Sequence, residues 1–99
     1  MGQTIEIKKV TPVGRVLVID TDRSLTGQDG ESFTGSQTAS QVDTLPARLA
    51  VRLFDADAEV DYVYVMSNTV SVRRRSDWDA DSMASAADVV AEFFRVYPD

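Results

Sequence analysis

Residues 60–74, with the sequence VDYVYVMSNTVSVRR, decide the fold of this chain. Two strand-like runs flank Ser67-Asn68, a pair that is short enough for a tight hairpin turn. Because alternate residues of a strand point to opposite faces of a sheet, one parity of this hairpin must face the core. The residues of the buried parity are Val63, Val65, Val70 and Val72.

The opposite parity of the hairpin carries the candidate binding residues. In a two-layer fold this face of the sheet is open, and aromatic residues, Met and Arg are enriched where proteins bind one another. Tyrosine is also a common strand residue on a wet sheet surface, and the sequence leaves that second interpretation open. The predicted partner-binding residues are Tyr62, Tyr64, Met66 and Arg73.

The first half of the chain predicts three further strands. Residues 4–10 alternate apolar and charged side chains, which is typical of a half-buried strand, and residues 11–14 (TPVG) predict a turn. Residues 15–20 (RVLVID) are apolar on both parities and predict a strand in the sheet interior, paired to the first as a hairpin. Residues 31–34 predict a short edge strand within a long polar stretch.

Two helices complete the pattern. Thr44 is placed to cap a helix that ends near Asp55, with Pro46 in its first turn and an apolar face formed by leucines. Ser76 or Asp77 is placed to cap the last helix. The apolar positions of that helix are Met83, Ala87, Val90, Phe94 and Tyr97.

The element order is therefore β-β-(β)-α-β-β-α. Hairpins separated by helices favour an α+β fold, a two-layer sandwich with a mostly antiparallel sheet and both helices on one face. The length of 99 residues fits a single domain, residues 1–99. We expect Trp78 to be structural, with its indole packed beneath the start of the last helix.

The composition restricts the chemistry of the chain. It contains no Cys and no His, which are the usual ligands of transition metals and iron–sulfur clusters, and His is also the usual acid–base residue near neutral pH. We therefore expect no catalytic residues, no bound metal and no cofactor. The net charge of -6 disfavours nucleic acid and anionic membrane surfaces as partners, and no stretch reaches a membrane-spanning length.

Two clusters of acidic residues and one of arginines leave cation binding or phosphate binding open as other interpretations. Asp77, Asp79 and Asp81, with Asp88 at the twelfth place, match part of a calcium-binding loop, but a helix N-terminus accounts for the same acids. A second group consists of Asp55, Asp57, Glu59 and Asp61, which we interpret as a solvated loop. Residues 73–75 (RRR) could suggest phosphate binding, but at the end of a strand they are more typical of ion-paired or solvated side chains.

Several segments together resemble the N-terminal domain of Nfu/NifU-type iron–sulfur scaffold proteins. They are LAVRLF at residues 49–54, the hairpin of residues 63–72, Asp77-Trp78, and Thr11-Pro12 between the first two strands. In order and spacing they span residues 4–94. In that family the cluster is bound by a second domain with a Cys-x-x-Cys motif, which this sequence lacks, so the resemblance implies a stand-alone accessory domain.

The resemblance implies a non-catalytic docking domain associated with iron–sulfur cluster assembly or delivery, which does not itself bind the cluster. Its partner would be an assembly or recipient protein, and we expect a cytoplasmic monomer. The alternative is a domain that binds a small ligand or a hard cation through its Asp clusters, and a hydrolase is a third, weaker hypothesis.

Overall fold

The central hairpin forms as the alternation predicts. In the computed structural model, which describes residues 7–21, 30–42 and 44–96, β4 (Val60–Met66) and β5 (Thr69–Arg74) pair antiparallel around Ser67 and Asn68. Ser67 takes the left-handed backbone conformation with φ 55°. The tip is held in place because the Asn68 carbonyl accepts hydrogen bonds from the backbone N–H and the hydroxyl of Thr21, at 2.9 and 3.0 Å.

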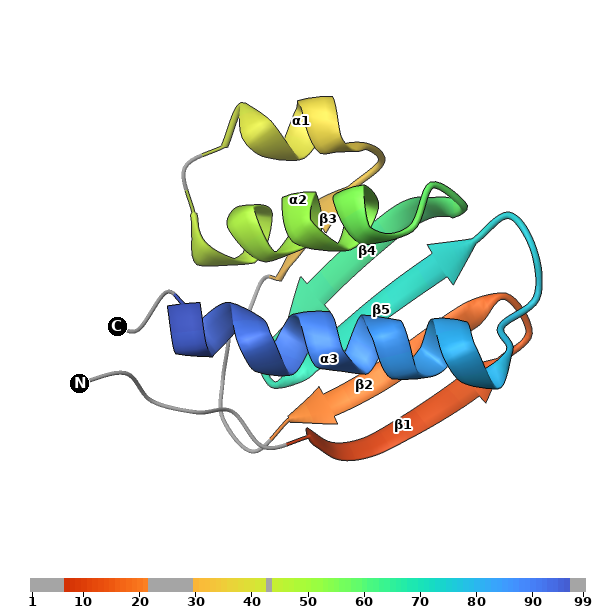
Figure 1. The fold of residues 1–99 in the computed structure, drawn as a ribbon. Helices are drawn as coiled ribbons and strands as arrows, with labels where there is room; N and C mark the ends of the chain where they lie inside the picture. The colour runs from red at the N-terminus through yellow and green to blue at the C-terminus, as the bar shows by residue number, and fades with distance from the viewer. Residues whose placement is uncertain (1–6, 22–29, 43, 97–99) are drawn as a thin grey trace.

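Three more strands extend this hairpin on both sides. They are β1 (Ile7–Val13), β2 (Val16–Thr21) and β3 (Glu31–Phe33), and the five antiparallel strands lie in the order β1-β2-β5-β4-β3 (Figure 1). The β1–β2 hairpin and the short edge strand are therefore confirmed. Residues 4–6 of the predicted first strand lie outside the described residues.

The predicted turn at residues 11–14 is wrong. β1 continues through Pro12 to Val13, and the turn lies at Gly14 and Arg15, where Gly14 takes φ 61°. β1 is an edge strand, in which every second backbone N–H points away from the sheet. Because proline has no N–H, it can take one of these positions without removing a hydrogen bond of the sheet. The Thr-Pro pair therefore does not end the strand.

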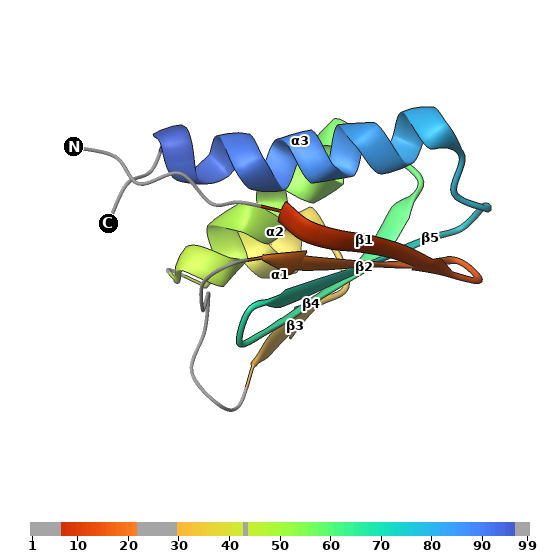
Figure 2. The same ribbon diagram turned by 90° about the horizontal axis from the view of Figure 1, so that it is seen from below.

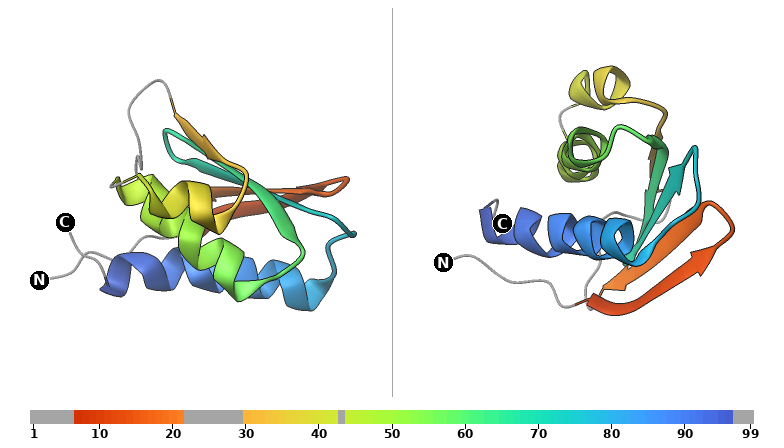
Figure 3. Two further views of the ribbon diagram at one scale, coloured as in Figure 1. Left: turned by 90° about the horizontal axis from the view of Figure 1, so that it is seen from above. Right: turned by 45° about the vertical axis from the view of Figure 1, so that its right-hand side comes forward.

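Helices α2 (Leu45–Ala56) and α3 (Ala80–Val96) lie together on one face of the sheet (Figures 1 and 2). α2 packs against β3 and β4, whereas α3 packs against β1 (Figure 3). The fold is thus the predicted α+β two-layer sandwich. A third helix, α1 (Ser36–Ser40), was not predicted and packs against α2.

The caps of the two long helices show one success and one error of sequence reasoning. The Thr44 hydroxyl accepts a hydrogen bond from the backbone N–H of Ala47 at 3.2 Å, so the predicted cap of α2 is confirmed. The predicted caps of the last helix, Ser76 and Asp77, are wrong, because Asp79 Oδ1 accepts from the backbone N–H of Ser82 at 2.7 Å. That helix therefore starts at Ala80.

The core lies between the sheet and the two long helices. The phase of α3 differs from the prediction, because Ala86 and Phe93 are buried while Ala87 is only half-buried. The Phe94 side chain and Tyr97 lie outside what the structure describes. The largest fully buried apolar side chains of the core are Leu17, Ile19, Leu49, Leu53, Val63, Val65, Val70, Val72 and Val90.

Trp78 joins the start of α3 to the sheet, as a structural role requires. Its half-buried indole packs against the core, and its N–H donates to the carbonyl of Arg15 in the β1–β2 turn at 2.8 Å. The guanidinium of Arg74 lies over the ring, 5.3 Å from its centroid. The ring therefore connects two segments that are distant in sequence.

We predict that Trp78→Ala lowers the free energy of unfolding by about 2 to 3 kcal/mol, somewhat less than for a fully buried aromatic residue. Trp78→Phe retains most of the packing and loses the indole N–H, so it should cost about 1 kcal/mol. Urea denaturation of the two variants and the parent measures both losses. A Trp78→Ala variant that unfolds with the parent would show that the ring has no structural role.

Candidate functional site

The sheet face that none of the described helices covers presents three rows of side chains across β4, β5 and β2. The first row contains Tyr62, Arg73 and Val16, the second contains Tyr64, Ser71 and Val18, and the third contains Met66, Thr69 and Asp20. Each row crosses three strands and is about 10 Å long, and the three rows together extend about 14 Å along the strands. We call these nine residues the open sheet face.

The open sheet face contains all the residues that the sequence predicted for partner binding. Tyr62 and Tyr64 are half-buried, Met66 is 42% exposed, and the Arg73 side chain is 49% exposed. The helices cover the other face, which holds the valines of the opposite parity (Figure 2). The structure therefore brings the four residues together on one continuous surface.

A β-bulge organises the first row. The pairing of β4 with β5 shifts between Val60 and Tyr62, so that Asp61 is the extra residue. The shift allows Val60 and Val63 both to face the core, and it places the Asp61 carboxylate 2.8 Å from Nε of Arg73. The same guanidinium lies over the Tyr62 ring, 5.2 Å from its centroid. Arg73 is thus held by two contacts on this surface.

A close backbone contact organises the other end. The Tyr64 hydroxyl donates to Met66 Sδ at 3.1 Å. Gly30, which leads into β3 with φ 71°, lies so near that an added Cβ would be 2.9 Å from the Val65 carbonyl oxygen and 3.1 Å from the Tyr64 hydroxyl. A side chain at this position would therefore disturb both the strand and the tyrosine.

Sequence reasoning missed the contribution of β2 to this surface. Residues 15–20, which are apolar on both parities, predict a strand in the sheet interior, and β2 does lie between β1 and β5, but this prediction assigns none of its residues to the open face. Leu17 and Ile19 are fully buried, but Val16 and Val18 are half-buried on the uncovered face, and the neighbouring Val13 of β1 is 61% exposed. The sequence did contain a signal for this surface. Both parities of residues 15–20 are apolar, although the helices cover only one face of the sheet, so one apolar parity must lie on the other face.

Three of the acidic residues considered for cation binding, Asp57, Asp61 and Asp79, have structural partners. The backbone N–H and the hydroxyl of Ser82 hydrogen-bond Asp79 and hold the pKa of its carboxyl below the usual range. Asp57 pairs with Arg74 at 2.9 Å and Asp61 with Arg73. Within residues 7–21, 30–42 and 44–96, no group of three or more acidic side chains could hold a metal ion.

The arginines of residues 73–75 are not arranged as a phosphate site. Arg73 and Arg74 pair with different aspartates, and Arg74 Nη1 also donates to the backbone carbonyl of Asp77. Consecutive strand residues point to opposite faces, so the two guanidiniums do not converge. This arrangement is consistent with the ion-paired strand end favoured by the sequence.

No helix in the described part of the chain is long and apolar enough to cross a membrane.

Comparisons with known proteins show the fold but not the function. No family model matches the chain, and no curated protein matches it. Among solved structures, the crystal structure of protein SAV1430 from Staphylococcus aureus, a structural genomics target, is similar with a TM-score of 0.61 and 16% identity. The similarity covers 86% of this chain and 96% of that chain. At this identity the likeness supports the α+β architecture alone.

We predict that Gly30→Ala lowers the free energy of unfolding by about 2 to 3 kcal/mol, because it combines an unfavourable positive φ with a clash against the β4 backbone. Gly14→Ala is the matched control: Gly14 has φ 61° but nothing within 4 Å of an added Cβ, so strain alone should cost about 1 kcal/mol. Thermal denaturation compares the two, and ring resonances of Tyr64 should shift only in Gly30→Ala. Equal losses with an unchanged Tyr64 would refute the close contact.

Proposed function

We propose that the chain is a non-catalytic docking domain that binds another protein through the open sheet face. The observation that supports this most directly is the set of Tyr62, Tyr64, Met66 and Arg73 on a sheet face that neither long helix covers. Val16 and Val18 extend the apolar part of that surface into the neighbouring strand. Aromatic side chains, Met and Arg on such a surface are typical of protein interfaces.

The geometry of this face favours binding because two of its side chains are already positioned. The contacts of Arg73 with Asp61 and with the Tyr62 ring restrict one end, and the contact of Gly30 with Tyr64 restricts the other. Ordering a flexible side chain on binding costs about 0.5 to 1.5 kcal/mol. Side chains that are ordered beforehand avoid part of this cost, so a modest surface can bind a partner.

The proposed partner is an iron–sulfur assembly or recipient protein. The chain would bind it as a monomer in the cytoplasm. The support is the resemblance of residues 4–94 to the N-terminal domain of Nfu/NifU-type scaffolds. Because the chain has neither Cys nor His, it offers no thiolate or imidazole to a cluster, and its contribution would be a protein contact without a cofactor. The alternative of a cation-binding domain has less support, since Asp57, Asp61 and Asp79 are each engaged by a neighbouring residue.

We predict that Tyr64→Ala weakens binding of the partner by about 1 to 3 kcal/mol, as expected of an aromatic interface anchor. The measurement is calorimetric titration of the chain with purified iron–sulfur scaffold and carrier proteins. Val42→Ala is the control, because Val42 is an apolar residue, 39% exposed, that lies outside the sheet, just after α1. It should leave the affinity unchanged.

Two results would contradict the proposal in different ways. Binding that is the same for Tyr64→Ala and the parent would show that the partner uses another surface. If none of these proteins binds, while affinity capture recovers a Tyr64-dependent protein without iron or sulfide, the docking role would stand and the iron–sulfur role would be wrong.

A further inference from the structure

Met66 places a thioether sulfur at one end of the open sheet face. It is the last residue of β4 and lies opposite Thr69 in the third row. At 42% exposure it is the most exposed apolar side chain of that face. The side chain is therefore open to solvent and to small oxidants dissolved in it.

The structure describes one other methionine, and its surroundings differ. Met83 of α3 is half-buried and packs against the core. A peroxide must reach the sulfur to oxidise it, so packing around Met83 slows a reaction that the position of Met66 permits. Of the two, Met66 is the one that an oxidant in solution meets first.

The sulfur of Met66 also has a hydrogen-bond donor at a defined position. The Tyr64 hydroxyl donates to Sδ at 3.1 Å, and the two residues share a face because they are two apart on one strand. Gly30 borders both side chains, since an added Cβ would lie 3.0 Å from the Met66 Cβ and 3.1 Å from the Tyr64 hydroxyl. The Tyr64 ring is half-buried, so its hydroxyl approaches the sulfur from a fixed side.

This contact makes the two sides of the sulfur inequivalent. A thioether sulfur has two lone pairs, and adding oxygen to one or to the other gives the two epimers of methionine sulfoxide. A hydroxyl that donates to sulfur engages one of these lone pairs. While Tyr64 donates to Met66, an oxidant reaches the other lone pair more readily. The geometry therefore predicts unequal amounts of the two epimers.

We propose that Met66 is a site of reversible oxidation by peroxide, and that the Tyr64 hydroxyl directs the reaction to one sulfoxide epimer. The free lone pair of Sδ attacks one oxygen of hydrogen peroxide, so that an S–O bond forms and the O–O bond breaks. The sulfur loses two electrons, and the other peroxide oxygen takes them together with the proton of the transferred oxygen and leaves as water. A dithiol reductant reverses the step, being oxidised to a disulfide as the sulfoxide oxygen leaves as water.

Oxidation would change the chemistry of the open sheet face. A sulfoxide is polar where the thioether is apolar, and burying a polar group that gains no new hydrogen bond is unfavourable. The oxidised chain should therefore bind the partner about five-fold more weakly, or weaker still. This effect on docking rests on the proposed function, whereas the oxidation of Met66 does not.

The test treats the full chain with hydrogen peroxide and follows oxidation by mass spectrometry. Trypsin places Met66 and Met83 on separate peptides, residues 53–73 and 76–95. Met66 should be oxidised at least about five-fold faster than Met83. The two classes of methionine sulfoxide reductase, each specific for one epimer, are then applied to the digested peptide. They should reveal an epimer ratio of about three to one or more, a bias that an ordinary neutral hydrogen bond can sustain.

Two variants test the part played by the Tyr64 hydroxyl. Tyr64→Phe keeps the ring and removes the donor, so Met66 should still be oxidised but should give the two epimers in nearly equal amounts. Tyr62→Phe is the matched control, because it removes a hydroxyl from the same strand and the same face, two residues further from Met66. It should keep the excess of one epimer. Circular dichroism verifies that both variants are folded.

The effect on docking is measured separately, by titrating the partner before and after the limited treatment that oxidises Met66. Binding by the parent should weaken, while Met66→Leu should bind with the same affinity before and after the treatment. Equal binding by the oxidised and untreated parent would contradict the effect on docking. If no iron–sulfur protein binds even the untreated chain, the proposed function fails, and the peptide measurements still decide the oxidation site.

Three results would each overturn the proposed site: oxidation of Met66 no faster than that of Met83, equal amounts of the two epimers in the parent, or the same excess of one epimer in Tyr64→Phe as in the parent. The first would show that the exposed sulfur is not selectively oxidised. The other two would show that the Tyr64 hydroxyl does not direct the reaction.

Discussion

The packing of α2 and α3 against one face of the sheet is the contact on which the rest of the structure depends. It buries Leu17, Ile19 and four valines of the central hairpin against Leu49, Leu53 and Val90, and each fully buried side chain of this kind contributes about 1.5 to 3 kcal/mol. Because both long helices pack on this face of the sheet, neither covers the opposite face. Residues of opposite parity in β2, β4 and β5 then point to the side of the sheet that no described helix covers.

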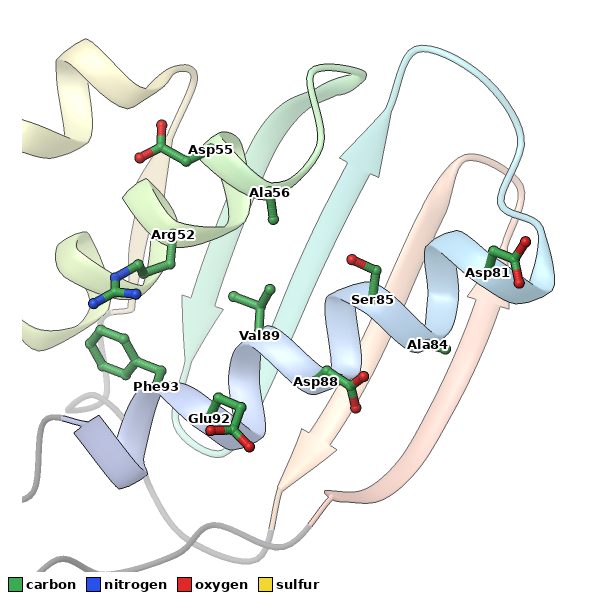
Figure 4. A pocket seen from close by; sticks show the side chains of 10 residues that line it. All are labelled: Arg52, Asp55, Ala56, Asp81, Ala84, Ser85, Asp88, Val89, Glu92 and Phe93. Carbon is green, nitrogen blue, oxygen red and sulfur yellow. The ribbon is translucent and has the colours of Figure 1, made fainter.

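This one-sided packing gives the molecule two surfaces of different chemistry. The open sheet face combines tyrosine, valine and methionine with only two charged residues, Asp20 and Arg73, and Arg73 is paired with the neighbouring Asp61. On the helical side, the hollow between α2 and α3 is lined by Asp55, Asp81, Asp88 and Glu92 together with Arg52 (Figure 4). The apolar contact surface and these acidic side chains thus lie on opposite sides of the sheet.

Local patterns predicted the parts of the structure that depend on neighbours in sequence. The alternation of residues 60–74 gave the hairpin and its two faces, and Thr44 gave the start of α2. Features that depend on distant residues were missed or misplaced. The position of Val16 and Val18 on the open face depends on which face the helices cover. The bulge at Asp61 depends on the register with β5, and the indole of Trp78 bonds to a residue 63 positions away in sequence. Helix α1 contains only one buried residue, Ala39, so it shows no amphipathic period.

Site-specific cross-linking tests the role of the open sheet face most directly. The chain has no cysteine, so Ser71→Cys introduces one thiol at the centre of that face, beside Tyr64 and Val18, for a photoactivatable cross-linker. The same label at Thr38→Cys lies on exposed α1. With the partner bound, our account predicts a cross-link from position 71 and none from position 38. Cross-linking from position 38 alone would contradict it.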